Sequence, residues 1–122
     1  MNYFIKINYR TGDSFHSEDC TDLLDLSWQN EEIANENLER IKEHYLMIQE
    51  LEHKKESNVI KKYKDKDWFV SNDNEIRGLY KYSLYLLLDN GEKKQYSTSM
   101  WVGYFETLYD VEVVCKGNSF HF

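Results

Sequence analysis

The sequence lacks proline altogether, has only three arginines among its fifteen basic residues, and contains no long hydrophobic run. No apolar stretch approaches the roughly 18 residues that a membrane-spanning helix needs, so the sequence predicts no membrane contact. The formal net charge of −7 disfavours nucleic acid as the main ligand, because neutralising phosphates requires clustered lysine and arginine. Acidity of this kind favours solubility, and a local acidic face can still meet a basic partner.

Cysteine is scarce as well, with two residues in the whole chain. Cys20 and Cys115 lie far apart in sequence and do not have the spacing of metal ligands. The sequence alone does not decide whether they form a disulfide. Met1 leads directly into a strand-like run, with no signal peptide before it. We therefore expect reduced thiols and a cytoplasmic location.

Recognisable catalytic motifs are absent from the sequence too. It contains no zinc signature, P-loop, GxGxxG or GxSxG pattern, and no two of its four histidines have metal spacing on one face. A serine or cysteine nucleophile needs a base that a single sequence cannot identify, so an enzyme stays an open alternative. The expectation is a protein without catalytic residues, metal or cofactor.

The stretch Leu79–Val102 predicts a long β-hairpin around which the rest of the chain is organised. Asn90-Gly91 lies at its centre, and a type I′ turn needs the positive φ that asparagine and glycine tolerate best. A two-residue turn here places Asp89 opposite Glu92. Large side chains on the first strand then face small ones on the second, a surface across which a helix can lie.

An alternation of apolar and polar residues predicts a half-buried strand over Tyr3–Arg10. Thr11–Asp13 predicts a turn, and Ser14–Glu18 is expected to return as a short antiparallel partner. Leu23–Trp28 indicates an irregular third strand or an extended connection into a helix.

A long amphipathic helix is predicted from Glu31 to Lys54, with Asn30 as its N-cap. Apolar residues recur along it at spacings of three and four, which places them on one face. They are Ala34, Leu38, Ile41, Tyr45, Ile48 and either Leu51 or Glu52, and His44, Leu46 and Met47 widen the stripe on its flanks. On the flank of this stripe, His44 is expected to pack or to face solvent rather than to bind a ligand.

The polar segment His53–Asp67 then predicts a solvated connector, and it holds the basic cluster of the chain. Its lysines are Lys54, Lys55, Lys61, Lys62, Lys64 and Lys66. Charge runs are usually solvated, but a loop that contacts phosphate is the functional alternative.

Two more strands are expected in the second half of the chain. Trp68–Val70 should re-enter the core as a short strand, and Tyr109–Lys116 alternates as a strand does. Between the hairpin and the last strand, the aromatic residues of Gly103–Tyr109 do not alternate. That segment is therefore interpreted as a turn or a single helical turn.

At 122 residues the chain has the usual size of one domain, here taken as residues 1–122. Its elements predict an α+β fold, an antiparallel sheet of about five strands with one long amphipathic helix packed on one face. The other face of such a sheet would be a natural surface for self-association, so a homo-oligomer is expected.

Aromatic side chains make up 16% of the chain and gather in its second half. Rings stack on flat bases with roughly 1–3 kcal/mol each, which suggests a nucleotide-like ligand, whereas core packing is the alternative role. Arginine is the side chain best shaped to grip phosphate. The candidate ligand-binding residues are therefore Arg10, Arg77, Tyr80, Tyr82, Trp101, Tyr104 and Phe105. The third arginine, Arg40, is expected to pair with Glu36.

The region Glu18–Glu36 carries seven acidic residues and no basic one. A solvated face, with some of the acids at a helix N-terminus, explains such a run. The alternative is an acidic patch that docks on a basic groove of a partner protein and mimics nucleic acid.

Three parts of the chain resemble small uncharacterised proteins of phages and prophages of low-GC bacteria. These are the start YFIKINYRTGDSF, the long helix, and the late segment WVGYFETLYDVEVV, in which WxGYFETLY is the most specific pattern. The resemblance covers nearly the whole chain and brings no catalytic motif. The lysine-rich, proline-free composition is typical of an AT-rich genome as well.

Small acidic phage proteins of this kind are often counter-defence factors. Some resemble oligomeric sponges that sequester nucleotide signals of host immune systems such as Thoeris or CBASS, while others inhibit a nuclease or another host protein. The resemblance therefore implies a non-enzymatic anti-defence protein that binds a nucleotide-derived immune signal in the cytoplasm of an infected or lysogenic host. The alternatives are an acidic inhibitor of a host defence protein or nuclease, acting through Glu18–Glu36, and an enzyme that degrades such a signal.

Overall fold

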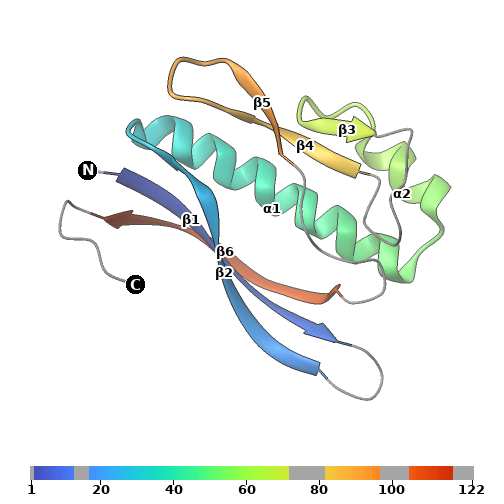
Figure 1. The fold of residues 1–122 in the computed structure, drawn as a ribbon. Helices are drawn as coiled ribbons and strands as arrows, with labels where there is room; N and C mark the ends of the chain where they lie inside the picture. The colour runs from blue at the N-terminus through green and yellow to red at the C-terminus, as the bar shows by residue number, and fades with distance from the viewer. Residues whose placement is uncertain (1, 13–16, 72–81, 97–104, 117–122) are drawn as a thin grey trace.

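The structure, a computed structural model, describes residues 2–12, 17–71, 82–96 and 105–116 and has an α+β fold (Figure 1). In order, its elements are β1 (Asn2–Gly12), β2 (Ser17–Trp28), α1 (Glu31–His53), α2 (Glu56–Tyr63), β3 (Phe69–Ser71), β4 (Tyr82–Leu87), β5 (Lys93–Tyr96) and β6 (Phe105–Lys116). Within these residues no helix is both long and apolar enough to cross a membrane.

The strands form two antiparallel sheets, not the single sheet of about five strands that the sequence predicts. One sheet has the order β2-β1-β6 and the other the order β3-β4-β5. Helix α1 lies between the sheets and packs against strands of both (Figure 1). The α+β class is confirmed, but a helix on one face of one sheet is wrong.

Local sequence determines how α1 begins. The side-chain oxygen of Asn30 accepts hydrogen bonds from the backbone N–H groups of Glu32 and Ile33, at 2.9 and 3.3 Å, which confirms the predicted N-cap. Beyond the predicted stripe, three further side chains of the helix are 0% exposed: Asn37, His44 and Met47. The buried surface is therefore wider than the stripe, as contact with two sheets requires.

Strand β1 confirms the predicted alternation, because Ile5 and Ile7 are fully buried against the core. Its partner β2 is one long strand that includes the segment expected at Leu23–Trp28 and the last two residues, Ser17 and Glu18, of the segment expected at Ser14–Glu18, whose first three residues lie outside the described ranges. The pairing shifts register once along β2, which explains why its apolar pattern looks irregular in sequence. The turn predicted at Thr11–Asp13 is wrong for Thr11 and Gly12, since both still pair with β2, and Asp13 lies outside the described residues.

Strands β4 and β5 confirm a hairpin around Asn90-Gly91, but its predicted register is wrong by one residue. Leu88, not Asp89, faces Glu92, and the Leu88 N–H donates to the Glu92 carbonyl at 2.8 Å. The loop therefore has three residues, with Gly91 at φ 84°. This is a type I turn followed by a left-handed residue, a common hairpin connection that places glycine last.

The predicted solvated connector His53–Asp67 contains the short helix α2, which the sequence interpretation missed. Val59 and Tyr63 are its buried residues. Trp68 follows with an exposed fraction of 1%, and β3 confirms the strand expected after it. These two buried residues and the half-buried Ile60 were enough to dock a helix whose other residues are polar.

Strand β6 confirms the strand predicted over Tyr109–Lys116 but begins earlier, at Phe105. The turn expected at Gly103–Tyr109 is therefore wrong from Phe105 onward, and the two residues before it lie outside the described ranges. Asn8 pairs with Asp110 whereas Tyr9 pairs with Leu108, so Tyr109 is an extra residue. This bulge breaks the alternation on which the prediction relied.

Two ion pairs tie α1 to the segment that follows α2. Arg40 lies 2.9 Å from Asp67, not beside Glu36 as predicted, and Lys66 lies 2.7 Å from Glu43. They hold the end of the connection that follows α2 beside α1, and α2 itself packs against the long helix.

Candidate functional site

The structure does not unite the candidate ligand-binding residues within its described ranges. Arg77, Tyr80, Trp101 and Tyr104 lie outside those ranges, as does the side chain of Phe105. The remaining two candidates belong to different sheets, Arg10 to β1 and Tyr82 to β4.

Tyr82 has the core role that the sequence left as the alternative. It is 6% exposed, and its hydroxyl donates to Glu56 of α2 at 3.0 Å. Arg10 is exposed on the other sheet, and its Nε lies 3.3 Å from Asp19 Oδ1. Neither of these two residues offers a phosphate-binding group beside an aromatic wall.

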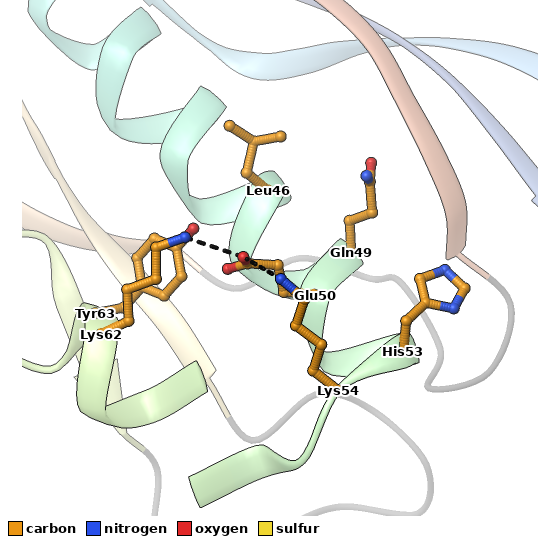
Figure 2. Close-up of a pocket in the computed structure, with 7 residues that line it drawn as sticks. All are labelled: Leu46, Gln49, Glu50, His53, Lys54, Lys62 and Tyr63. Carbon is orange, nitrogen blue, oxygen red and sulfur yellow. Dashed lines mark hydrogen bonds and ion pairs between the residues drawn. The ribbon is translucent and has the colours of Figure 1, made fainter. Parts of the chain in front are cut away.

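A pocket of about 310 Å³ lies between the C-terminal half of α1 and helix α2 (Figure 2). Its lining consists of Leu46, Gln49, Glu50, His53, Lys54, Lys62 and Tyr63. The first five come from α1 and its C-cap, and the last two from α2. The pocket therefore exists only because α2 docks on α1.

Helical spacing explains why these α1 residues share one wall. Leu46, Gln49, Glu50 and His53 are separated by three or four positions, which places them on one face of a helix. Gln49 also fixes this wall to the neighbouring sheet, because its Oε1 accepts a hydrogen bond from the backbone N–H of Leu108 at 2.9 Å. Strand β6 thus supports the pocket from the side opposite α2.

Two lysines from different helices converge on one carboxylate oxygen. The ammonium groups of Lys54 and Lys62 lie 3.1 and 3.0 Å from Glu50 Oε1, as Figure 2 shows. Both lysine side chains are about 60% exposed, at 62% and 61%, whereas Glu50 is 18% exposed. The cations therefore stand at the mouth of the pocket, and the carboxylate lies deeper.

Glu50 is ionised near neutral pH despite this burial. Burial by itself raises the pKa of Glu50, but hydrogen bonding from Lys62, Tyr63 and Lys54 outweighs it and lowers the pKa to about 2. The hydrogen bond with Glu50 also raises the pKa of Lys62. Two cations and one anion leave this part of the pocket with a net positive charge on a chain of charge −7.

The second oxygen of the same carboxylate is in a different situation. Glu50 Oε2 is buried and has no hydrogen-bond partner among the described residues. An ionised carboxylate only accepts hydrogen bonds, so this oxygen can be satisfied only by a donor.

Apolar surface in the pocket comes from a leucine and a tyrosine. Leu46 is 37% exposed, an unusual position for leucine on a helix that is otherwise buried on several sides. The Tyr63 ring is 6% exposed, and the Lys62 ammonium lies 5.1 Å from its centroid. Tyr63 is thus too buried to offer a stacking platform, and Leu46 offers the open apolar contact.

None of the pocket residues belongs to the candidates taken from the sequence. The signal that could have found them was the lysine cluster of the segment His53–Asp67, for which a phosphate-contacting loop was the functional alternative. Because the segment was interpreted as a solvated connector, the sequence did not predict which residue Lys62 would contact. Only the helical form of α2 turns that lysine toward Glu50.

His44 was expected to pack or to face solvent, and it is completely buried. Its ring meets that of Trp68 edge to face, with centroids 5.7 Å apart, and burial lowers the pKa of His44 to about 3. Neither ring nitrogen has a hydrogen-bond partner among the described residues. A neutral imidazole held among rings is a core residue, not a base for catalysis.

The seven acidic residues of Glu18–Glu36 are all exposed, but they do not share one face. Asp22 accepts a hydrogen bond from the buried Tyr9, whereas Asp19 pairs with Arg10 on the opposite side of β1. No group of three or more histidine, cysteine, aspartate or glutamate residues suited to a metal ion occurs in the described part of the chain.

Comparison of the chain with protein-family models, with curated proteins and with solved structures finds no match. The resemblance to phage and prophage proteins therefore stays a prediction. Function has to be inferred from the chemistry of the described side chains, and the pocket between α1 and α2 is where polar groups converge.

Proposed function

We propose that this protein binds and sequesters a small, phosphate-bearing, nucleotide-derived ligand in the pocket between α1 and α2. The observation that carries this proposal is the meeting of Lys54 and Lys62, from two different helical segments, at the mouth of a ligand-sized pocket. Lysine ammonium groups bind phosphate oxygens as point charges, and their exposure leaves them able to reorient toward an incoming anion.

The size of the pocket supports a mononucleotide-sized ligand. A volume of about 310 Å³ lies at the lower end of the range typical of small-molecule sites, roughly 300–1,000 Å³. A larger signal such as a cyclic dinucleotide would insert one nucleotide unit and leave the rest outside this pocket. A second subunit could then cover the part that stays outside.

The electrostatics of the pocket favour binding over catalysis. A general acid or base works best when its pKa lies near the working pH, and the pKa of Glu50 is about 2. Glu50 is then a fixed negative charge that orients cations and donors. Sequestration requires binding but no group that transfers protons, since the ligand is not altered.

The biological setting of the proposal rests on the resemblance of the start of the chain and of WxGYFETLY to phage and prophage proteins. A protein that holds a nucleotide signal without destroying it would lower the free signal in an infected cell. We therefore propose an anti-defence role in the bacterial cytoplasm, with the protein acting stoichiometrically rather than by turnover.

Native mass spectrometry tests the proposal directly, with the purified protein measured alone and after exposure to AMP, cyclic nucleotides and cyclic ADP-ribose isomers. The expected result is a bound species that releases intact ligand on denaturation. The double variant Lys54→Ala/Lys62→Ala should lose this species. A matched control, Lys42→Ala/Lys61→Ala, removes one exposed lysine from each helix outside the pocket and should keep it. Apo masses under every condition would refute sequestration, and recovery of altered ligand would indicate an enzyme.

An acidic inhibitor of a host defence protein or nuclease is the second candidate. The exposure of all seven acidic residues between Glu18 and Glu36 favours it, while the split of Asp19 and Asp22 between two faces weakens it. Charge reversal of Asp19, Asp25 and Glu32 should abolish capture of a basic partner from host lysate. Unchanged capture would count against this candidate.

Self-association is part of the proposal and is measured in the same mass spectra. The face of the β2-β1-β6 sheet that carries Lys6 and Arg10 holds Phe4 and Val114 opposite each other, both half-buried. Such a mixed face suits contact between two copies of the chain. A monomer at micromolar concentration would argue against a homo-oligomer.

A further inference from the structure

The side-chain amide of Gln49 has a fixed orientation in the pocket. Its Oε1 accepts a hydrogen bond from the backbone N–H of Leu108 in β6, at 2.9 Å. A backbone N–H can only donate, so the oxygen of the amide, and not its nitrogen, has to face this group. The Nε2 group is therefore the part of the amide that is left for a ligand.

This nitrogen differs from the unpaired oxygen of Glu50 in its accessibility. Glu50 Oε2 is fully buried, so a molecule in the pocket does not reach it. Gln49 Nε2 has no hydrogen-bond partner among the described residues either, but it is not one of their fully buried unpaired atoms. Since Gln49 lines the pocket, a bound molecule can contact its amide nitrogen.

An apolar contact lies beside this donor. Leu46 precedes Gln49 by three positions, which places their Cβ atoms roughly 5–6 Å apart on one face of α1. Leu46 is 37% exposed, and Gln49 lies on the side of the pocket toward β6, opposite the α2 residues (Figure 2). Lys54 follows Gln49 by five positions, a rise of about 8 Å along the helix axis. Along α1 the pocket thus offers a cation, a directed donor and an apolar side chain.

We propose that Gln49 selects the base of the ligand, by donating a hydrogen bond from Nε2 to an exocyclic oxygen. The base then packs on Leu46, and the phosphate binds Lys54 and Lys62. This inference rests on the proposed function, because it concerns the same pocket. It names the ligand class more narrowly, as a nucleotide whose base carries a carbonyl at the edge far from the phosphate. Hypoxanthine, guanine and uracil have such an oxygen, whereas adenine and cytosine carry an amino group there.

The fixed amide is what makes this selection possible. A glutamine without a partner can turn its amide over and pair with either an oxygen or an amino group. Turning the Gln49 amide over would place its NH₂ group against the N–H of Leu108, so that two donors would face each other. An amino group on the base would likewise meet a donor at Nε2. A site built to bond one group rejects an analogue that cannot make that bond.

Isothermal titration calorimetry with IMP and AMP tests the selection, because the two nucleotides share sugar and phosphate and differ at the purine edge. A hydrogen bond lost at a half-buried donor corresponds to about 5- to 10-fold in affinity, so wild type should bind IMP about 5-fold more tightly or better.

Gln49→Glu keeps an acceptor for the N–H of Leu108 and replaces the Nε2 donor by an oxygen. The variant should therefore bind AMP at least as tightly as IMP. Its added charge weakens both phosphates alike, so the ratio of the two affinities is the quantity to compare. Asn35→Asp is the matched control, since it adds the same charge at an exposed position of α1 outside the pocket and should keep the wild-type ratio.

The outcomes separate this inference from the function beneath it. Equal binding of IMP and AMP by wild type, lost in Lys54→Ala/Lys62→Ala, would keep the phosphate site and overturn the role of Gln49. A preference for IMP that persists in Gln49→Glu would overturn that role as well. Absence of binding for both nucleotides would overturn the proposed function together with the inference.

A third nucleotide decides the question if Gln49→Glu does not fold. Purine riboside 5′-monophosphate carries neither an oxygen nor an amino group at this edge of the base. Wild type should bind it more weakly than IMP and more tightly than AMP. If AMP binds as tightly as this compound, Nε2 does not oppose the amino group and the selection is wrong.

Discussion

The two ends of α1 treat their polar groups in opposite ways. At the N-terminal end, the Asp89 carboxylate accepts from the backbone N–H groups of Gln29 and Asn30, at 3.0–3.2 Å. About two turns further, the buried Asn37 side chain both donates to and accepts from the backbone of Leu87, at 2.8 Å each way. These groups are satisfied within the protein.

At the C-terminal end, Glu50 is satisfied through only one of its two oxygens. Its partners, Lys54 and Lys62, are mostly exposed instead of buried. A polar side chain that is completely paired stabilises the fold, whereas the ammonium groups of Lys54 and Lys62 remain accessible to solvent at the mouth of the pocket. The N-terminal end thus holds the β3-β4-β5 sheet to the helix, and the C-terminal end carries the candidate function.

Asn37→Leu should have the largest effect on stability, because it removes the buried hydrogen bonds near the N-terminal end of α1. The substitution removes two hydrogen bonds and leaves the buried N–H of Leu87 without its acceptor, so we expect a loss of about 3 kcal/mol in the free energy of unfolding. Urea denaturation measures it. Asn35→Ala, at an exposed position of the same helix, should change the free energy by less than about 1 kcal/mol. Equal effects would mean that Asn37 does not join the sheet to α1.

His44, between the two ends, should make stability depend on pH. Its pKa of about 3 in the fold lies below the ordinary 6.5, so the unfolded chain binds the proton first as the pH falls. This contribution to stability is complete above pH 6.5 and is lost progressively toward pH 3, by about 2 kcal/mol between pH 6.5 and 5.

Denaturation of wild type and His44→Met at several pH values isolates this contribution. Methionine has a similar size and does not titrate, so its stability curve should be flatter over that range by the same amount. Parallel curves would show that His44 is accessible to protons in the folded state.

Asp89→Ala should have a smaller effect, because the side chain is exposed. Loss of its bonds to the backbone before α1 should cost about 1 kcal/mol, as for other capping interactions, and Asp89→Asn should recover part of it. Thermal unfolding of the three proteins compares them. If Asp89→Asn is no more stable than Asp89→Ala, then charge, not hydrogen bonding, holds the hairpin to the helix.

Lys54→Ala/Lys62→Ala should have the smallest effect on stability. Both lysines are more than half exposed, and exposed ion pairs contribute roughly 0–1 kcal/mol each. We expect a change of less than about 2 kcal/mol in urea denaturation, with Lys42→Ala/Lys61→Ala changing the free energy of unfolding by less than about 1 kcal/mol. A loss of several kcal/mol would assign these lysines to the fold and remove the contrast between the two ends of α1.

Features governed by neighbouring residues were predictable from the sequence. The N-cap at Asn30 and the helix that follows depend on hydrogen bonds and spacings within a few positions, and the structure confirms both. The strand through Ile5 and Ile7 follows from alternation alone. The hairpin at Asn90-Gly91 was also found, but the length of its loop was not, because the same two residues fit a two-residue or a three-residue turn.

Errors arose where a distant partner alters the local pattern. The bulge at Tyr109 is a property of the pairing between β1 and β6, and it disrupts an alternation that the segment would otherwise show. Helix α2 forms with only two buried residues, Val59 and Tyr63, because α1 is there to receive them. A scan for periodicity finds too little signal in such a short helix.

The same division holds for the candidate site and for the architecture as a whole. Chemistry within short stretches of chain settles which residues are charged, which can cap a helix and which alternate. Bringing Lys62 to Glu50, or Gln49 to the backbone of Leu108 from 59 residues away, depends on how α1 packs between two sheets. Packing buries groups that are separated in sequence, and burial decides whether a carboxylate is simply solvated or depends on hydrogen-bond donors that the fold brings to it.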